Sequence, residues 1–360
     1  MMNAKIKRKL EERNKRIIQA IIKKMEIICP GSVALIGIYG SFYSGDIHEK
    51  SDLDLLIIIT DDRGWGLSSC FILDGIGFDI YCSKWDSLEH MAEYHDPYCG
   101  NLIDLEIVYS LDKEAEERYD QLQKKLLKKL NSSLSAEDVE KAKGFLHKAE
   151  SKYVDVMINN DIAKCRSASA QLLCYLEFSL YMLNKKIVKY GIKRIPEEIK
   201  GMEILPANFL ELHNQIVFAE TVQEMKESCT EIIKIMRNCF QGFEKSNHEK
   251  SELSANGLRG TYEEIYSNWR NKMFYSATID NAYLSYQTVA SCQNFYDEMA
   301  NDFAIKSINV IKDFSPSDLA KTAACFDIAL AEYLKLYEQM NVDIISYKTI
   351  EEFEKGYLID

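Results

Sequence analysis

The sequence is poor in residues that break or cross-link a chain. Its 360 residues include only 5 Pro and 16 Gly, which excludes a collagen-like or low-complexity chain and favours helix. No apolar run approaches the ~20 residues of a transmembrane helix. The charged start, residues 1–8, is not followed by the hydrophobic core of a signal peptide. We therefore expect a soluble, cytoplasmic protein without a membrane partner.

Paired cysteine or histidine ligands are also missing. The ten cysteines are scattered and form no C-x-x-C pair, and the six histidines show no metal-ligand spacing. In a chain of this length the cysteines are expected to be small buried side chains in a reducing compartment. The sequence thus predicts neither a disulfide framework nor a zinc site.

The charge is acidic overall but uneven. The formal net charge is −12, whereas residues 1–30 carry nine Lys or Arg against three Glu. An acidic surface repels the phosphate backbone of nucleic acids. The sequence therefore argues against long DNA or RNA as a partner, unless a local basic strip binds it.

The first third of the chain alternates helix and strand patterns. Residues 4–28 have apolar residues at helical spacing with Lys and Arg between them, as in a membrane-surface helix or a helix that covers a sheet. The second interpretation is favoured because a short apolar strand, residues 32–39, follows. Further strands are predicted at 53–60, at 70–82 as a hairpin turning at Asp74–Gly75, and at 102–109.

The pattern beyond Asp112 is helical. Ser135 and Asp161 are predicted N-caps of two long helices, and the polar segment 244–258 is a linker candidate. We predict an α+β fold in which a mixed sheet with flanking helices precedes an all-α region of helical bundles. The expected domains are residues 1–131, 132–243 and 259–360.

Two carboxylates stand at the start of an apolar strand. Asp52 and Asp54 are two residues apart, so in an extended chain both point to one face, roughly 7 Å apart. Either could be an ordinary solvated strand-end carboxylate. A divalent cation would relieve their repulsion, and oxygen ligands without Cys or His suit Mg²⁺.

Two further features support this interpretation. Gly40–Ser41 follows the first strand, where a turn into a helix can offer backbone N–H groups to phosphate oxygens. Asp79 lies in an apolar strand pattern, with Phe78 and Ile80 on the opposite face. If that strand neighbours the one after Asp54, three carboxylates converge and can hold two Mg²⁺ ions for in-line phosphoryl chemistry.

A Gly-Ser pair, ten intervening residues, Asp-x-Asp and a later third carboxylate resemble the nucleotidyltransferase superfamily that includes DNA polymerase β. The chain looks most similar to the bacterial branch of aminoglycoside and lincosamide nucleotidyltransferases. The resemblance covers residues 37–54 and, more weakly, continues to residue 112. It implies a catalytic α/β domain followed by helices, and a dimer in which two subunits share a site is one possible form.

The resemblance also implies the roles of individual residues. Asp52, Asp54 and Asp79 match the metal-binding carboxylates, Asp79 being either a ligand or the general base, and Gly40 and Ser41 match the pair that grips the triphosphate. Relatives often carry an Arg two residues after the Ser, where this chain has Tyr43. A phosphate contact is therefore expected from elsewhere, such as Lys148 or Lys152. The expected nucleotide contacts are Gly40, Ser41, Tyr43, Ser51, Lys148 and Lys152.

The expected reaction is Mg²⁺-dependent transfer of AMP from ATP to a hydroxyl group of an aminoglycoside-like small molecule, with release of pyrophosphate. A helix face bearing Tyr175, Glu177, Tyr181 and Asn184 could line an acceptor pocket or could be ordinary packing. Two alternatives remain open: transfer to a protein or tRNA, as in toxin–antitoxin systems, and a nucleotide-sensing protein without catalysis.

Overall fold

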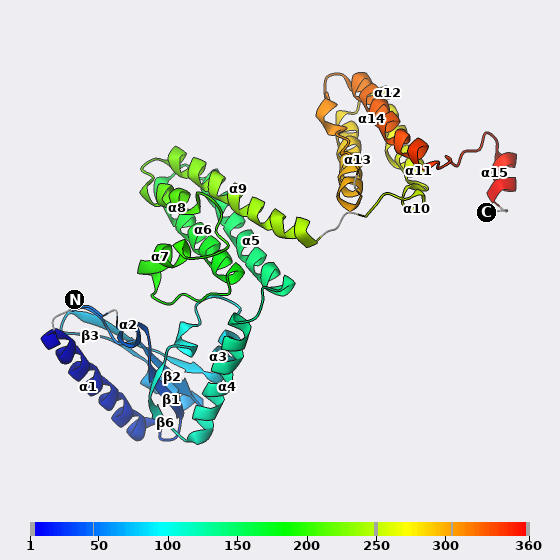
Figure 1. The fold of residues 1–360 in the computed structure, drawn as a ribbon. Helices are drawn as coiled ribbons and strands as arrows, with labels where there is room; N and C mark the ends of the chain where they lie inside the picture. The colour runs from blue at the N-terminus through cyan, green and yellow to red at the C-terminus, as the bar shows by residue number, and fades with distance from the viewer. Residues whose placement is uncertain (1–3, 46, 248–250, 304, 358–360) are drawn as a thin grey trace. The chain divides into compact units, whose positions relative to one another are not determined.

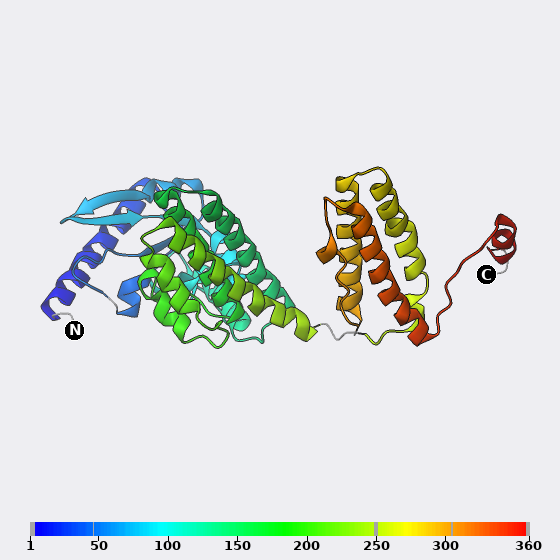
Figure 2. The same cartoon turned by 90° about the horizontal axis from the view of Figure 1, so that it is seen from above.

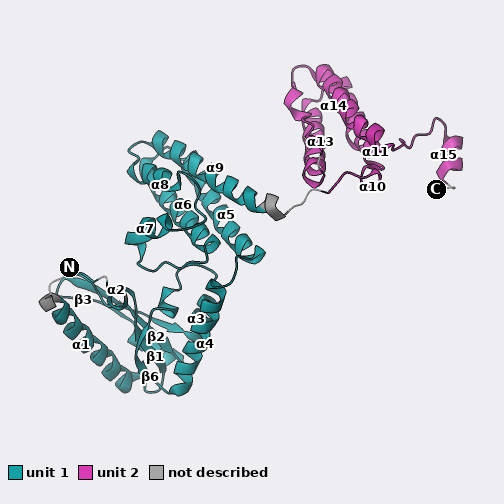
Figure 3. Ribbon diagram, in the orientation of Figure 1, with its two compact units in different colours: residues 1–243 teal, residues 244–360 magenta. Residues whose placement is uncertain are grey.

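The computed structural model describes residues 4–45, 47–247, 251–303 and 305–357. The chain forms two compact units, residues 1–243 and 244–360 (Figure 3). Each unit is described by itself below. The boundary predicted at residue 131 lies inside the first unit.

The first unit contains a four-stranded mixed sheet in the order β5-β2-β1-β6. The central strand β1 (Val33–Ile38) pairs antiparallel with β2 (Leu55–Ile59) and with β6 (Glu106–Ser110). The edge strand β5 (Cys82–Lys84) pairs parallel with β2. Every residue of β2 is buried, which explains its unbroken Leu/Ile run.

Strands β3 (Ser69–Leu73) and β4 (Ile76–Ile80) form a separate two-stranded hairpin. Its two turn residues, Asp74 and Gly75, have φ values of 53° and 74°, the left-handed pair that a tight type I′ turn requires. The predicted hairpin is thus confirmed. Figure 2 shows it as an arm projecting beside helix α1.

Helices cover both faces of the sheet (Figure 1). Helix α1 (Ala4–Ile28) buries Ile17, Ile21 and Met25 against one face, so its apolar stripe covers a sheet, as predicted, and does not face outward. Helices α3 (Trp85–Ala92) and α4 (Lys113–Leu130) pack on the other face. Two short 3₁₀ turns, η1 (Asp62–Leu67) and η2 (Gly100–Leu102), connect these elements.

Helices occupy the rest of the first unit. Ser135 and Asp161 cap α5 and α6 through side-chain bonds to backbone N–H groups, as predicted, and Ser135 forms a full capping box with Asp138. The helices after α4 are α5 (Ala136–Ile158), α6 (Ile162–Leu183), η3 (Ile192–Arg194), α7 (Ile195–Lys200), α8 (Phe209–Phe218) and α9 (Val222–Asn247), and the last turn of α9 continues past the boundary at residue 243.

One apolar cluster joins these helices to the sheet. It runs from Leu35 and Ile58 of the sheet through Tyr119 of α4 to Leu176 of α6 and Met236 of α9. The sheet and the helical part of the first unit therefore share a core.

Among the residues described, the second unit contains helices and an isolated β-bridge between Ser251 and Phe303. The predicted domain 259–360 lies within this unit. Its core is rich in tyrosine, including Tyr296, Tyr333 and Tyr337. Its elements are α10 (Ala255–Leu258), α11 (Thr261–Ile265), the π-helical turn η4 (Tyr266–Arg270), α12 (Asn271–Thr278), α13 (Ala282–Asp302), η5 (Ile311–Asp313), α14 (Leu319–Met340) and α15 (Ile350–Tyr357). Part of the predicted linker 244–258, residues 248–250, lies outside the described residues.

The predicted α+β class is confirmed, with the mixed sheet early in the chain and helices after it. All ten cysteines are free; Cys70 is exposed, contrary to the expectation that all are buried, and the others are buried or half-buried. No helix within the described ranges is both long enough and apolar enough to cross a bilayer.

Candidate active site

The antiparallel pairing of β1 with β2 brings the two key sequence motifs together. Because Ile38 pairs with Leu55, the residues after β1 lie beside those before β2. The backbone N–H of Tyr39 donates to the Asp54 carbonyl oxygen at 3.2 Å. The backbone N–H of Ser41 donates to the Asp54 carboxylate. Sheet register alone therefore places Asp54 against the Gly40–Ser41 turn.

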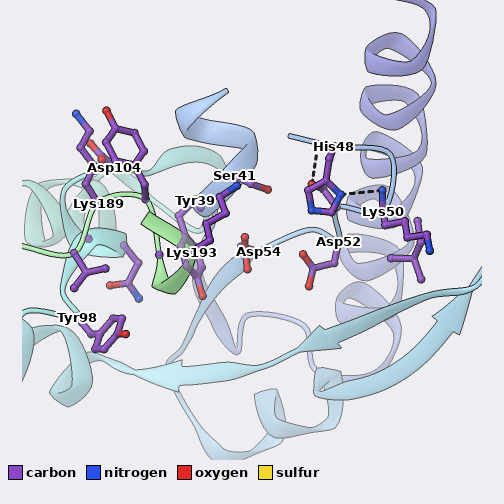
Figure 4. Close-up of a pocket in the computed structure, with 18 of the residues that line it drawn as sticks. Tyr39, Ser41, His48, Lys50, Asp52, Asp54, Tyr98, Asp104, Lys189 and Lys193 are labelled. Carbon is purple, nitrogen blue, oxygen red and sulfur yellow. Dashed lines mark hydrogen bonds between the residues drawn. The ribbon is translucent and has the colours of Figure 1, made fainter. Parts of the chain in front are cut away.

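Asp54 is half-buried and its carboxyl pKa is raised. Burial is the main cause and the negative charge of Asp52 adds to it, while the Ser41 N–H bond opposes both. Asp52 is exposed. Figure 4 shows both side chains pointing into the same opening below Ser41. Both carboxylates are hard oxygen donors, and burial and the charge of Asp52 disfavour the negative charge of Asp54. Such a pair fits a divalent cation such as Mg²⁺.

Gly40 allows Asp54 to come this close. Its φ is +69°, and a Cβ built there would stand 2.1 Å from Asp54 Oδ2. Any larger residue would have to adopt a left-handed conformation and also displace the carboxylate.

We expect Gly40→Ala to lower kcat about 10²-fold, because a shift of about 1 Å in a reacting group costs that much. Gly45→Ala is the matched control, since Gly45 has a similar φ of +75° and nothing within 4 Å of its added Cβ. Both variants should lose about 1–2 kcal/mol of stability to backbone strain, measured by urea unfolding. Equal activities of the two variants would show that the contact between Gly40 and Asp54 does not contribute to catalysis.

Asp79 lies on β4, which pairs with β3 and not with β2. The chain continues into β5, however, where Cys82 pairs with Ile57 of β2. Asp79 lies three residues before Cys82, and Asp54 lies three residues before Ile57. The two aspartates therefore lie at the same height along neighbouring segments. The residue after each is buried in the core under α1. Both carboxylates therefore belong to the opposite face.

The charges of all three carboxylates act on the Tyr39 hydroxyl. Its pKa is raised, first by burial and then by the charges of Asp54, Asp52 and Asp79. No three acidic, thiol or imidazole groups among the described residues form a ready-made ligand cluster. Asp79 is exposed and accepts a hydrogen bond from the Cys70 thiol at 3.2 Å. Its role as third carboxylate stays a prediction.

A cavity of about 670 Å³ opens beside the carboxylates. The turn after β1 and the Asp52–Asp54 segment form one wall, and Gly77 of the hairpin contributes to it. Residues 98–104 and the loop between α6 and α7 form the other wall (Figure 4). That loop supplies Lys189 and Lys193, and Lys50 lies beside Asp52.

The loop that carries Lys189 and Lys193 is held at several points. The Glu198 carboxylate accepts hydrogen bonds from the backbone N–H groups of Lys189 and Tyr190, at 3.1 and 2.8 Å. At its start Lys185 forms a 2.7 Å ion pair with Asp138 of α5. The loop, residues 185–194, has five Lys or Arg and no acid in an acidic chain. This charge run is the signal that sequence reasoning missed.

The predicted phosphate contacts Lys148 and Lys152 do not line the cavity. The Lys148 ammonium lies 4.6 Å from the centre of the Phe145 ring. Lys152 pairs with Asp155 at 3.0 Å, one turn along the same helix. Both are held by neighbours on α5, so the structure gives no support to their predicted role. Lys189 and Lys193 are the better candidates.

The other predicted nucleotide contacts differ in whether they line the cavity. Gly40, Ser41 and Ser51 line the cavity, whereas Tyr43 does not and its side chain is exposed. Ser51 is buried and its Oγ accepts the His48 N–H at 2.9 Å. Its hydroxyl therefore shapes the loop before Asp52.

For the α6 face, the sequence left two alternatives, an acceptor pocket and ordinary packing, and the contacts favour packing. Glu177 bonds to His213 at 3.0 Å and Tyr181 donates to Glu198 at 3.0 Å. Asn184 bonds to both backbone groups of Ile204. None of these, nor Tyr175, lines the cavity. The helix is covered on several sides, which its aromatic pattern alone did not reveal.

Comparison with known proteins finds a family model that matches part of the chain. Residues 15–173 match the family model described as nucleotidyltransferase domain, which spans the Gly40–Ser41 turn and all three carboxylates. No curated protein matches the chain significantly. Among the solved structures that match is a nucleotidyltransferase-like protein from Exiguobacterium sibiricum, with 11% identity and a TM-score of 0.37. That match covers 78% of this chain and 91% of the other.

The family match supports the superfamily resemblance predicted from the Gly-Ser and Asp-x-Asp spacing, and with it an enzyme of the nucleotidyl-transferring class. The closer likeness to the aminoglycoside and lincosamide branch stays a prediction.

Proposed function

With residues 15–173 matching a nucleotidyltransferase domain, we propose that the protein transfers AMP from ATP to a hydroxyl group of an aminoglycoside-like small molecule. The observation that carries the proposal is the arrangement around Asp54. Its carboxylate is held by the Gly40–Ser41 turn beside Asp52, at one wall of a cavity whose other wall presents Lys189 and Lys193. Acidic oxygens facing cations across such a gap suit a metal-bound triphosphate.

In the proposed reaction the acceptor hydroxyl oxygen attacks the α-phosphorus of the nucleotide. A new P–O bond forms there while the bond to the β-phosphate oxygen breaks, and pyrophosphate leaves. Asp79, exposed on the hairpin, takes the hydroxyl proton or completes the metal ligands. Asp52 and Asp54 would hold a Mg²⁺ ion, which would supply positive charge to the phosphoryl oxygens.

Lys189 and Lys193 are proposed to hold the leaving phosphates. A charge-assisted contact to phosphate contributes about 1.5–3 kcal/mol, and 1.4 kcal/mol corresponds to a factor of ten in binding. We propose that the acceptor enters the cavity between its two walls.

The proposal is tested with purified protein, ATP labelled at the α-phosphate, Mg²⁺ and a panel of aminoglycosides and lincosamides. Pyrophosphate release that requires one of these acceptors supports the proposal. Label appearing on added tRNA or on protein would instead favour a macromolecular acceptor. Nucleotide binding without turnover on any acceptor would contradict catalysis.

We expect Lys189→Met and Lys193→Met each to raise KM for the nucleotide about tenfold with a smaller effect on kcat. The effect should weaken at high salt, because these contacts are ionic and both lysines are exposed. Lys186→Met is the matched control: its ammonium donates to the Gly201 carbonyl oxygen at 3.0 Å and does not line the cavity. An unchanged KM in both test variants would remove these lysines from the nucleotide site.

A further inference from the structure

Arg13 on helix α1 touches both segments that carry the exposed carboxylates. It precedes the family match, which begins at residue 15. Its Nη2 donates to the Ser51 carbonyl oxygen at 2.7 Å, and Ser51 is the residue before Asp52. Its guanidinium carbon lies 4.9 Å from the centre of the Phe78 ring. Phe78 is the residue before Asp79.

The position of the guanidinium group is fixed from several sides. Nε and Nη2 both donate to the Asn14 side-chain oxygen, at 3.1 and 3.0 Å. The side chain is half-buried, and the Phe78 ring beneath it is buried. A planar cation with a rigid fork of donors can satisfy such a set of partners, whereas a lysine ammonium cannot.

The contacts of Arg13 complement those of the Gly40–Ser41 turn. Asp54 is restrained directly by the Ser41 N–H. Asp52 and Asp79 are exposed, and no hydrogen bond to Asp52 occurs among those found in the described residues. Arg13 contacts the backbone before one and the ring before the other. It is therefore placed to set the distance between the two segments.

We propose that Arg13 is a positioning residue that fixes the spacing of Asp52 and Asp79 from outside the site. This inference rests on the proposed function, since it assumes that these carboxylates act together on a divalent cation. Arg13 itself does not line the cavity. It acts through its contacts with Ser51 and Phe78, and its positive charge also interacts with Asp52.

The test compares Arg13→Lys, Arg13→Gln and Arg16→Gln with the wild-type protein. Lysine keeps the charge but loses the fork and the flat stacking surface. Arg16 is the control because it lies one turn along α1, is exposed and has no hydrogen-bond or ion-pair partner among the described residues. The measurements are Mn²⁺ binding followed by the paramagnetic resonance of the free ion, thermal unfolding without metal, and kcat and KM.

We expect Arg13→Lys to weaken Mn²⁺ binding about tenfold, the size of effect found when a residue supporting a metal ligand is changed. Its kcat should fall by about 10²-fold while KM for the nucleotide, set by the opposite wall, changes little. Arg13→Gln should be at least as impaired. Arg16→Gln should match wild type in all three measurements.

Two results would overturn the inference. One is Mn²⁺ affinity and kcat in both Arg13 variants equal to those of Arg16→Gln. The other is a loss of kcat that only follows a loss of folded protein, with Mn²⁺ binding unchanged in the folded fraction. If wild type binds Mn²⁺ but transfers nothing, the proposed function fails, while the Mn²⁺ affinities of the variants still decide the role of Arg13.

Discussion

Replacing Asp54 with Asn is expected to lower nucleotidyl transfer at least about 10³-fold while making the metal-free protein more stable. The loss follows because the amide cannot supply the negative oxygen that binds the cation, and about 4 kcal/mol of transition-state stabilisation corresponds to that factor. Pyrophosphate release with ATP and an accepted substrate measures it.

The gain in stability follows from the sign of the pKa shift. The folded protein raises the pKa of Asp54, chiefly by burial and next by Asp52, so ionisation of this group opposes folding. The penalty is absent below the ordinary carboxyl pKa and grows as pH rises through the folded value. Asn at this position cannot ionise, and it therefore removes the penalty at neutral pH.

The role of Asp54 in metal binding can be separated from its effect on the stability of the metal-free protein by adding Mg²⁺. We expect Mg²⁺ to raise the melting temperature of wild type by mass action and to have much less effect on the Asn variant. Asp120→Asn, an exposed carboxylate on α4, is the control and should leave activity unchanged. If Asp54→Asn kept wild-type activity, or melted earlier than wild type without metal, the proposed metal site would be wrong.

Replacing Lys185 with Met is expected to destabilise the first unit by about 3 kcal/mol. Lys185 and Asp138 are 10% and 12% exposed and pair at 2.7 Å. Removing one partner of a buried pair leaves an uncompensated charge, which costs about 3–5 kcal/mol. The low end is expected because Asp138 keeps its hydrogen bonds to Ser135. Urea unfolding at pH 7 measures the difference.

The pH dependence of this pair has a definite sign. Burial alone would raise the pKa of Asp138, but the bonds from Lys185 and Ser135 outweigh it and the pKa is lowered. The stabilisation is therefore full above the ordinary carboxyl pKa and is lost as pH falls through the folded value. In Lys185→Met this loss on acidification should be smaller.

Asp138→Asn combined with Lys185→Met should recover part of the stability, since no buried charge remains. The single Lys185 variant should also raise KM for the nucleotide, because the ion pair anchors the start of the loop that carries Lys189 and Lys193. A variant that unfolds like wild type at pH 7 would show that the pair is not stabilising.

The local parts of this architecture could be predicted from short stretches of sequence. Ser135 and Asp161 begin helices because a side-chain oxygen bonds a free N–H two or three residues later, which spacing alone reveals. Asp74–Gly75 makes a tight hairpin because both residues tolerate positive φ. The Gly40–Ser41 and Asp52–Asp54 motifs lie within 15 residues, so one pairing of adjacent strands brings them together.

The parts that short stretches of sequence do not determine depend on contacts between distant segments. Lys148 had the right charge, but its helix directs it to Phe145. Lys189 comes from a loop about 150 residues beyond Gly40, and its position depends on how α6 packs on the sheet. Asp79 depends on how the chain crosses from the hairpin into β5. Sequence spacing carries none of this information without the tertiary packing.

The shared core of the first unit constrains how its specificity can change. Because the apolar cluster continues from the sheet into α9, the helical half is not an exchangeable module, and grafting another in its place would expose the interior of both halves. Under the proposed function, a change of acceptor is expected to come from substitutions at Tyr98, Asp104 and Tyr190, which line the cavity outside the buried cluster. Changes in acceptor specificity are therefore expected from single substitutions around this cavity, and not from exchange of the helical half.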